Sequence, residues 1–65
     1  MTPVELRERR EALGLTQAQL AERLKVRQHH LSRWETGAVP ITDLRAAWLD
    51  RELTRLETRQ VERPS

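Results

Sequence analysis

Two capping boxes near the beginning of the chain constrain its fold more than any other feature of the sequence. Thr2 is followed three residues later by Glu5, and Thr16 by Gln19. In this pattern the threonine side chain and the glutamate or glutamine side chain satisfy each other's backbone amides at the start of a helix. Gly14, a residue suited to the left-handed conformation that closes a helix, stands between the two boxes. The pattern predicts one helix over residues 3–13 and another over 17–24, separated by a tight turn.

Two more helices follow in the sequence. Residues 28–36 have helical periodicity and are followed by Gly37 as a stop signal. Thr42 or Asp43 can cap a fourth helix, which we expect to run to about residue 59 because no glycine or proline interrupts it. The sequence therefore predicts an all-α fold, a compact bundle of four or five helices. We expect a single domain over residues 1–59 and a disordered tail over 60–65.

Composition excludes several classes of protein. The 65 residues include no cysteine, so neither a disulfide nor a thiolate metal site is available. His29 and His30 are adjacent and would diverge by about 100° on a helix, which makes them a poor metal pair. No cofactor motif and no catalytic set is present, so we expect no enzyme activity. The chain has no membrane-length apolar run and no signal peptide, and we expect a cytoplasmic protein.

The net charge of +2 is concentrated in the middle of the chain. The segments 1–14 and 41–65 are each neutral, and residues 15–40 carry the whole excess. Within this segment, the helix over 28–36 has two different faces on a helical wheel. One face holds Leu31, Trp34 and Glu35, and the other holds His29, Ser32 and Arg33. An exposed basic surface of this kind indicates an anionic partner.

The fourth helix carries two apolar stripes. The first consists of Ile41, Leu44, Ala47 and Trp48, and we expect it to cover the preceding helices. The second lies roughly 120–180° away from Leu44 on the wheel and needs another surface. A second copy of the chain is the simplest occupant, and a kink near Asp50 that folds the tail back is the alternative. The second stripe consists of Leu49, Leu53 and Leu56.

Two short helices joined by a brief turn, the second with a polar face, outline a helix-turn-helix. The residues in and around this unit resemble the Cro and phage-repressor family, also called Xre-like, over about residues 4–49. The resemblance implies a lambda-repressor-like bundle that binds double-stranded operator DNA, usually as a dimer. It rests on Leu13-Gly14-Leu15-Thr16-Gln17, Leu20-Ala21, Leu24, Val26, Gln28, Leu31-Ser32-Arg33-Trp34-Glu35, Gly37 and Pro40.

The resemblance also implies roles for individual residues. Gln17 maps to a phosphate contact at the start of the first helix of the pair, and Arg10 and Glu35 map to an internal ion pair. The chain departs from the family where Lys25 replaces a common turn glycine and Arg27 replaces a Ser or Thr cap; both cations are candidate phosphate contacts. The candidate base contacts are Gln28, His29, Ser32 and Arg33.

These observations predict a sequence-specific transcription regulator. We expect a repressor that binds a pseudo-palindromic operator as a homodimer, with recognition helices about 34 Å apart. One alternative is an antitoxin-type protein whose C-terminal helix, through Leu49, Leu53 and Leu56, binds a toxin or another protein partner. Another is an interaction module that has lost DNA binding. If the purified chain forms a homodimer, the repressor is favoured. If it is a monomer that tends to associate with other proteins, the antitoxin is favoured.

Overall fold

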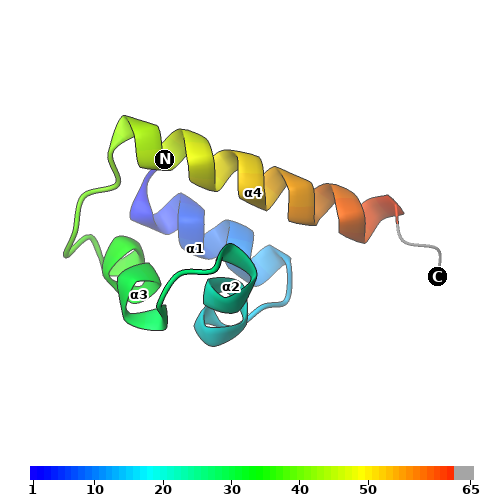
Figure 1. Ribbon diagram of the computed structural model, residues 1–65, viewed down its shortest axis with the longest axis horizontal. Helices are drawn as coiled ribbons and strands as arrows, with labels where there is room; N and C mark the ends of the chain where they lie inside the picture. The colour runs from blue at the N-terminus through cyan, green and yellow to red at the C-terminus, as the bar shows by residue number, and fades with distance from the viewer. Residues whose placement is uncertain (63–65) are drawn as a thin grey trace.

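The computed structural model describes residues 1–62, which form four α-helices and no strand (Figure 1). The helices are α1 (Pro3–Ala12), α2 (Gln17–Leu24), α3 (Gln28–Thr36) and α4 (Asp43–Glu62). Figure 1 shows α1 between the long α4 on one side and the α2–α3 pair on the other. The prediction of an all-α bundle with four helices is confirmed.

Both predicted capping boxes are present. The backbone N–H of Glu5 donates to Thr2 Oγ1 at 3.1 Å, and Glu5 Oε1 accepts from the backbone of Thr2 at 3.4 Å. The backbone N–H of Gln19 donates to Thr16 Oγ1 at 3.1 Å, and the Gln19 side chain accepts in return at 2.9 Å. Side chains therefore satisfy amides that would otherwise lack partners at the start of α1 and of α2.

The two glycines close helices in the left-handed conformation. Gly14 has φ +72° and Gly37 has φ +81°. Leu13 acts as the C-terminal cap of α1, which ends at Ala12, one residue before the predicted end. The backbone N–H of Gly14 donates to the carbonyl of Glu11 at 2.9 Å and tightens this last turn.

Apolar side chains from all four helices meet in one core. Leu6, Leu20 and Leu31 from α1, α2 and α3 are fully buried. Burying a leucine side chain contributes roughly 1.5–3 kcal/mol, so these contacts are the main stabilising element of the bundle. The buried apolar set is Leu6, Leu13, Leu20, Ala21, Leu24, Leu31, Trp34, Leu49 and Leu53.

The orientation predicted for α4 is wrong. Leu49 and Leu53, expected to face a second copy or another partner, are 0% exposed within the single chain, and Leu56 packs half-buried against the same core. Leu44, expected in the core, is 84% exposed. Ala47 is also exposed, while Ile41 and Trp48 are half-buried. The second leucine stripe therefore belongs to the core of the chain and is not a free docking surface.

Arg9 on α1 reinforces this orientation of α4. Its guanidinium donates to Asp50 Oδ1 at 2.7 Å, to Thr54 Oγ1 at 3.2 Å and to both carboxylate oxygens of Glu57 at 2.9 and 3.0 Å. These partners immediately follow the three leucines along the helix, so Arg9 holds the leucine face against α1. No kink is needed, because α4 runs without interruption through Asp50.

The C-terminal boundary differs from the prediction as well. The last helix extends to Glu62, whereas we expected it to end at about residue 59 with a disordered tail beyond. Residues 63–65 of that tail lie outside the described residues. Within residues 1–62, no helix is both long and apolar enough to cross a membrane.

Paired alanine substitutions test the orientation of α4. Leu53→Ala should lower the free energy of unfolding by about 2–5 kcal/mol, because it leaves a cavity in the core. Leu44→Ala should change it by less than about 0.5 kcal/mol, because the side chain is exposed. Urea unfolding, followed by circular dichroism, measures both. A larger loss for Leu44→Ala than for Leu53→Ala would contradict the orientation described here.

Candidate nucleic-acid interface

The turn between α2 and α3 keeps a glycine-like geometry without a glycine. Lys25 has φ 60° and ψ 39°, and it is the only non-glycine residue with positive φ among those described. The backbone N–H of Val26 then donates to the carbonyl of Ala21 at 3.0 Å, and the Val26 side chain packs against the core. The left-handed backbone costs about 1–2 kcal/mol for a residue with a side chain.

Arg27 occupies the cap position of α3. Its backbone is extended (φ −78°, ψ 144°) and it makes no side-chain capping bond, because a guanidinium has no acceptor. Its carbonyl accepts from His30 and Leu31, which begins the helix at Gln28 as predicted. Lys25 and Arg27 are both exposed, so the turn presents two cations to solvent.

Helix α3 has one face in the core and one face in solvent. Leu31, Trp34 and Glu35 are buried. Gln28, His29 and Arg33 are exposed on the opposite side, and Ser32 is half-buried between the two faces. The helical-wheel prediction for α3 therefore matches the structure.

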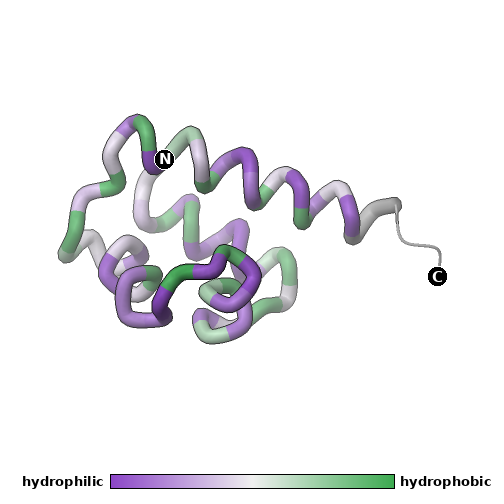
Figure 2. Tube along the Cα trace, in the orientation of Figure 1, coloured by the Kyte–Doolittle hydropathy of each residue, from purple (hydrophilic) through white to green (hydrophobic). Residues whose placement is uncertain are grey.

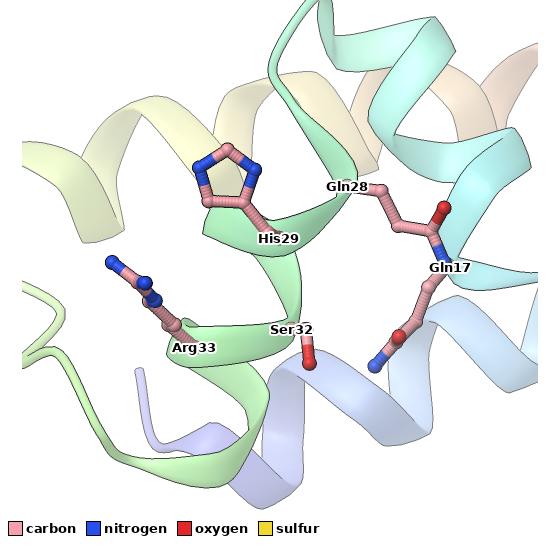
Figure 3. A pocket seen from close by; sticks show the side chains of 5 residues that line it. All are labelled: Gln17, Gln28, His29, Ser32 and Arg33. Carbon is pink, nitrogen blue, oxygen red and sulfur yellow. The ribbon is translucent and has the colours of Figure 1, made fainter.

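The polar side chains of α3 share an open hollow with one residue of α2. Figure 3 shows His29 and Arg33 extending to one side of α3 and Gln28 extending to the other. The side chains that line the hollow are Gln17, Gln28, His29, Ser32 and Arg33. The structure thus brings together the four candidate base contacts and the candidate phosphate contact Gln17. Lys25 and Arg27 lie beside them, in the connecting turn.

The charge of this surface comes from Lys25, Arg27 and Arg33. The ring of His29 lies 4.5 Å from the ring of His30, centroid to centroid, at a tilt of 54°. Partial desolvation lowers the pKa of His29, and His30, Arg33 and Arg27 lower it further by repulsion. The neutral form of His29 therefore dominates at pH 7, where it offers both a donor and an acceptor.

A buried ion pair supports the hollow from behind. Arg10 Nε donates to Glu35 Oε2 at 2.8 Å and its NH2 group donates to Oε1 at 3.1 Å. The Arg10 and Glu35 side chains are only 12% and 2% exposed. These hydrogen bonds raise the pKa of Arg10, which stays charged. Arg10 NH1 also donates to the carbonyl of Leu15 at 2.9 Å, so the pair links α1, α3 and the segment that leads into α2.

Two features of this support were not predicted from the sequence. Gln17 Nε2 donates to Glu35 Oε1 at 3.1 Å, so a residue that lines the hollow is bonded to the ion pair. The signal that could have indicated it is the capacity of a buried carboxylate for more acceptor bonds than one arginine supplies. The guanidinium of Arg45 also lies over the rings of Trp34 and Trp48, at 5.2 and 5.0 Å from their centroids. This stacking attaches the start of α4 to the core side of α3.

The described residues offer no cluster of His, Cys, Asp or Glu that could hold a metal ion. What they offer is a helix with an exposed polar face, preceded by a second helix across a short basic turn. That arrangement defines the class of helix-turn-helix proteins that bind DNA.

The sequence comparison agrees with this class. A model of the helix-turn-helix family matches residues 6–48, about two thirds of the chain, and the protein belongs to that family in its Xre/Cro-like form. No curated protein and no solved structure matches the chain significantly. The family membership makes the protein a DNA-binding transcription regulator.

The strained turn generates a stability prediction. Lys25→Gly should raise the free energy of unfolding by about 0.5–1 kcal/mol, because relief of the left-handed strain exceeds the entropy that glycine loses on folding. Lys25→Ala is the matched control, since it removes the same charge and keeps the strain. Thermal unfolding measures both variants. If Lys25→Gly is no more stable than Lys25→Ala, the backbone strain assigned to this position is wrong.

Proposed function

We propose that the protein is a repressor that inserts α3 into the major groove of a pseudo-palindromic operator and binds that operator as a homodimer. One observation carries the proposal: residues of α2 and α3 alone line one open surface. A helix of this diameter fits the major groove, where base edges present a readable pattern of donors and acceptors. The position of α4 on the far side of α1 leaves this surface free.

Each side chain of the surface has chemistry suited to DNA. Arg33 can donate two bonds to guanine and Gln28 can pair with adenine, while neutral His29 can donate to one base atom and accept from another. Ser32 suits a phosphate or a water-mediated base contact. We assign the backbone phosphates to Lys25, Arg27 and Gln17, the last at the start of α2, where helix amides favour an anion.

Loss of Arg33 tests the assignment of the reading surface. Selection from a randomised duplex pool first supplies the operator. Arg33→Ala should then weaken operator binding by about 1–3 kcal/mol and relax preference at one guanine. The slope of log K against log salt should change little, because the phosphate contacts that set it are assigned to other residues. Fluorescence anisotropy at several salt concentrations measures both quantities.

Arg51→Ala is the matched control for Arg33→Ala. Arg51 is exposed on α4, and α4 lies across α1 from the reading surface. Removal of Arg51 changes the net charge by the same amount as removal of Arg33. It should leave the base preference unaltered. Equal losses from the two variants would show attraction by net charge alone and would exclude α3 as the reading helix.

The homodimer needs a surface other than the one expected from the sequence. Because Leu49 and Leu53 are buried in the core, neither a second copy nor a toxin can bind them, and the antitoxin alternative loses the observation on which it rested. The large apolar side chains that stay exposed among residues 1–59 are Val4, Val39 and Leu44. They come from the start of α1, the loop after α3 and the first turn of α4. Figures 1 and 2 show these segments at one end of the molecule, where hydrophobic stretches alternate with polar ones along the loop and the start of α4.

The size of this end limits the strength of the dimer. The two shorter dimensions of the molecule are 21 and 19 Å. The cross-section of the backbone at this end is therefore about 400 Å², and the exposed apolar side chains on it are few, compared with the roughly 800 Å² that each partner buries in a stable interface. We therefore propose that the two copies pair only when bound to DNA. Two adjacent half-sites hold the copies close together, and the high effective concentration that results compensates for the small contact.

Leu44→Glu tests this pairing. The unmodified chain should sediment as a monomer without DNA, and two copies should bind an inverted repeat cooperatively. Leu44→Glu should retain affinity for a single half-site and lose the cooperativity, because it places two carboxylates in the contact. Leu44→Met is the control that preserves the apolar surface. Unchanged cooperativity in Leu44→Glu would move the dimer contact elsewhere.

A further inference from the structure

We infer that Glu35 is a positioning residue for DNA binding, which orients the Gln17 amide toward a phosphate of the DNA backbone. The inference rests on the proposed function, since it takes the surface of α2 and α3 as the side that meets DNA. It assigns to the buried ion pair a role in binding in addition to its role in stability. The observation behind it is the hydrogen bond of 3.1 Å from Gln17 Nε2 to Glu35 Oε1.

The two residues occupy different places relative to the surface. Gln17 is the first residue of α2, is half-buried and lines the hollow. The Glu35 side chain is 2% exposed on the core side of α3, so it has no access to a ligand. Any influence of Glu35 on DNA therefore passes through a neighbour. Among the described residues, Gln17 is the one that both hydrogen-bonds to Glu35 and lines the hollow.

The chemistry of the bond fixes the orientation of the amide. The oxygens of an ionised carboxylate only accept hydrogen bonds, so Gln17 must present its nitrogen to Glu35. That choice settles which end of the amide is the donor and restrains its rotation. The second N–H of the same nitrogen remains for a phosphate oxygen. A glutamine free to rotate would lose about three- to tenfold in affinity on being immobilised by DNA, a cost that Gln17 avoids.

Arg10 makes this arrangement compatible with an approaching phosphate. A bare carboxylate one hydrogen bond behind the contact would repel the DNA backbone. The guanidinium of Arg10 binds both oxygens of Glu35 and neutralises that charge. Arg10 also donates to the carbonyl of Leu15, which holds the chain two residues before Gln17. The same pair therefore positions both the backbone and the side chain at the start of α2.

A cycle of four proteins tests the coupling. The first variant is Gln17→Met, which keeps the length of the side chain and removes its donors. The second combines Arg10→Met with Glu35→Leu, because an apolar replacement of a whole buried ion pair is usually tolerated and leaves net charge unchanged. The third variant carries all three substitutions, and the unmodified chain is the reference. Affinity is measured by anisotropy on a labelled duplex of random sequence at low salt, where phosphate contacts dominate.

The positioning role predicts non-additive losses. Gln17→Met should weaken binding by about three- to tenfold, the ion-pair replacement by a similar factor, and the triple variant no further. The salt dependence should stay the same in all four proteins, because each retains the same net charge. If the two losses multiply in the triple variant, Glu35 does not act through Gln17 and the inference is overturned.

A measurement on the unmodified protein covers the case in which the ion-pair replacement fails to fold. Gln28 is exposed on the same surface and serves as an internal control for Gln17. In ¹⁵N NMR, the side-chain amide of Gln17 should be more ordered and exchange its protons more slowly than that of Gln28. Equal mobility of the two amides in the free protein would overturn the positioning role.

Failure of the inference is distinguishable from failure of the proposed function. Multiplying losses or equal amide mobility, together with a clear effect of Arg33→Ala, would overturn only the role of Glu35. No effect of Gln17→Met with a clear effect of Arg33→Ala would likewise overturn the inference and leave α3 as the reading helix. If the unmodified chain does not bind the duplex at low salt, the proposed function fails and the inference fails with it.

Discussion

The ion pair between Arg10 and Glu35 joins the elements that build the polar surface. It binds α1 to the end of α3, and through the Leu15 carbonyl and the Gln17 amide it also holds the start of α2. Both charges are nearly removed from water, so the loss of either partner would leave an unpaired buried charge at a cost of about 3–5 kcal/mol. A domain of this size has a total stability of only about 3–10 kcal/mol. The relative placement of α2 and α3 therefore depends on this one pair of side chains as well as on the apolar core.

A second arginine on α1 performs a related task on the side of that helix that faces α4. Arg9 binds Asp50, Thr54 and Glu57 of α4, but its side chain is 25% exposed, so water weakens each of its bonds. Burial of Leu49 and Leu53 provides the larger part of the attachment. Adjacent arginines thus give α1 two different partners, and α1 separates a long covering helix from the pair of helices with the polar surface. This arrangement leaves that surface unobstructed.

Local signals predicted most of the fold, and the one large error was an error of orientation. Capping boxes and closing glycines act within a few residues, so they located the first three helices to within one residue at each end. The wheel of α3 was informative because its two faces differ sharply in polarity. The wheel of α4 carries two apolar stripes, and periodicity does not say which one meets the domain. What decides is the packing of Leu49 and Leu53 in the core. Arg9, some forty residues away, reinforces it through Asp50 and Glu57, which look like ordinary solvated charges when the sequence is considered alone. The bond from Gln17 to Glu35 was missed for the same reason: it joins residues that only the tertiary structure brings together.

In the turn between α2 and α3, Lys25 and Arg27 carry positive charge at positions where other residues would give a more stable turn. Lys25 keeps the left-handed backbone that a glycine would adopt without strain, and Arg27 keeps the cap position without the side-chain acceptor that a serine would supply. The strain costs about 1–2 kcal/mol and a missing cap about 0.5–2 kcal/mol, a large share of what a domain this small can lose. Neither side chain is buried and neither residue improves the packing. What both add is a positive charge beside the hollow of α2 and α3. On a surface that meets a polyanion, each such charge displaces a condensed counterion and strengthens binding. A DNA-binding role therefore accounts for a lysine in the left-handed position and for an arginine at the cap position, where neither residue favours local stability.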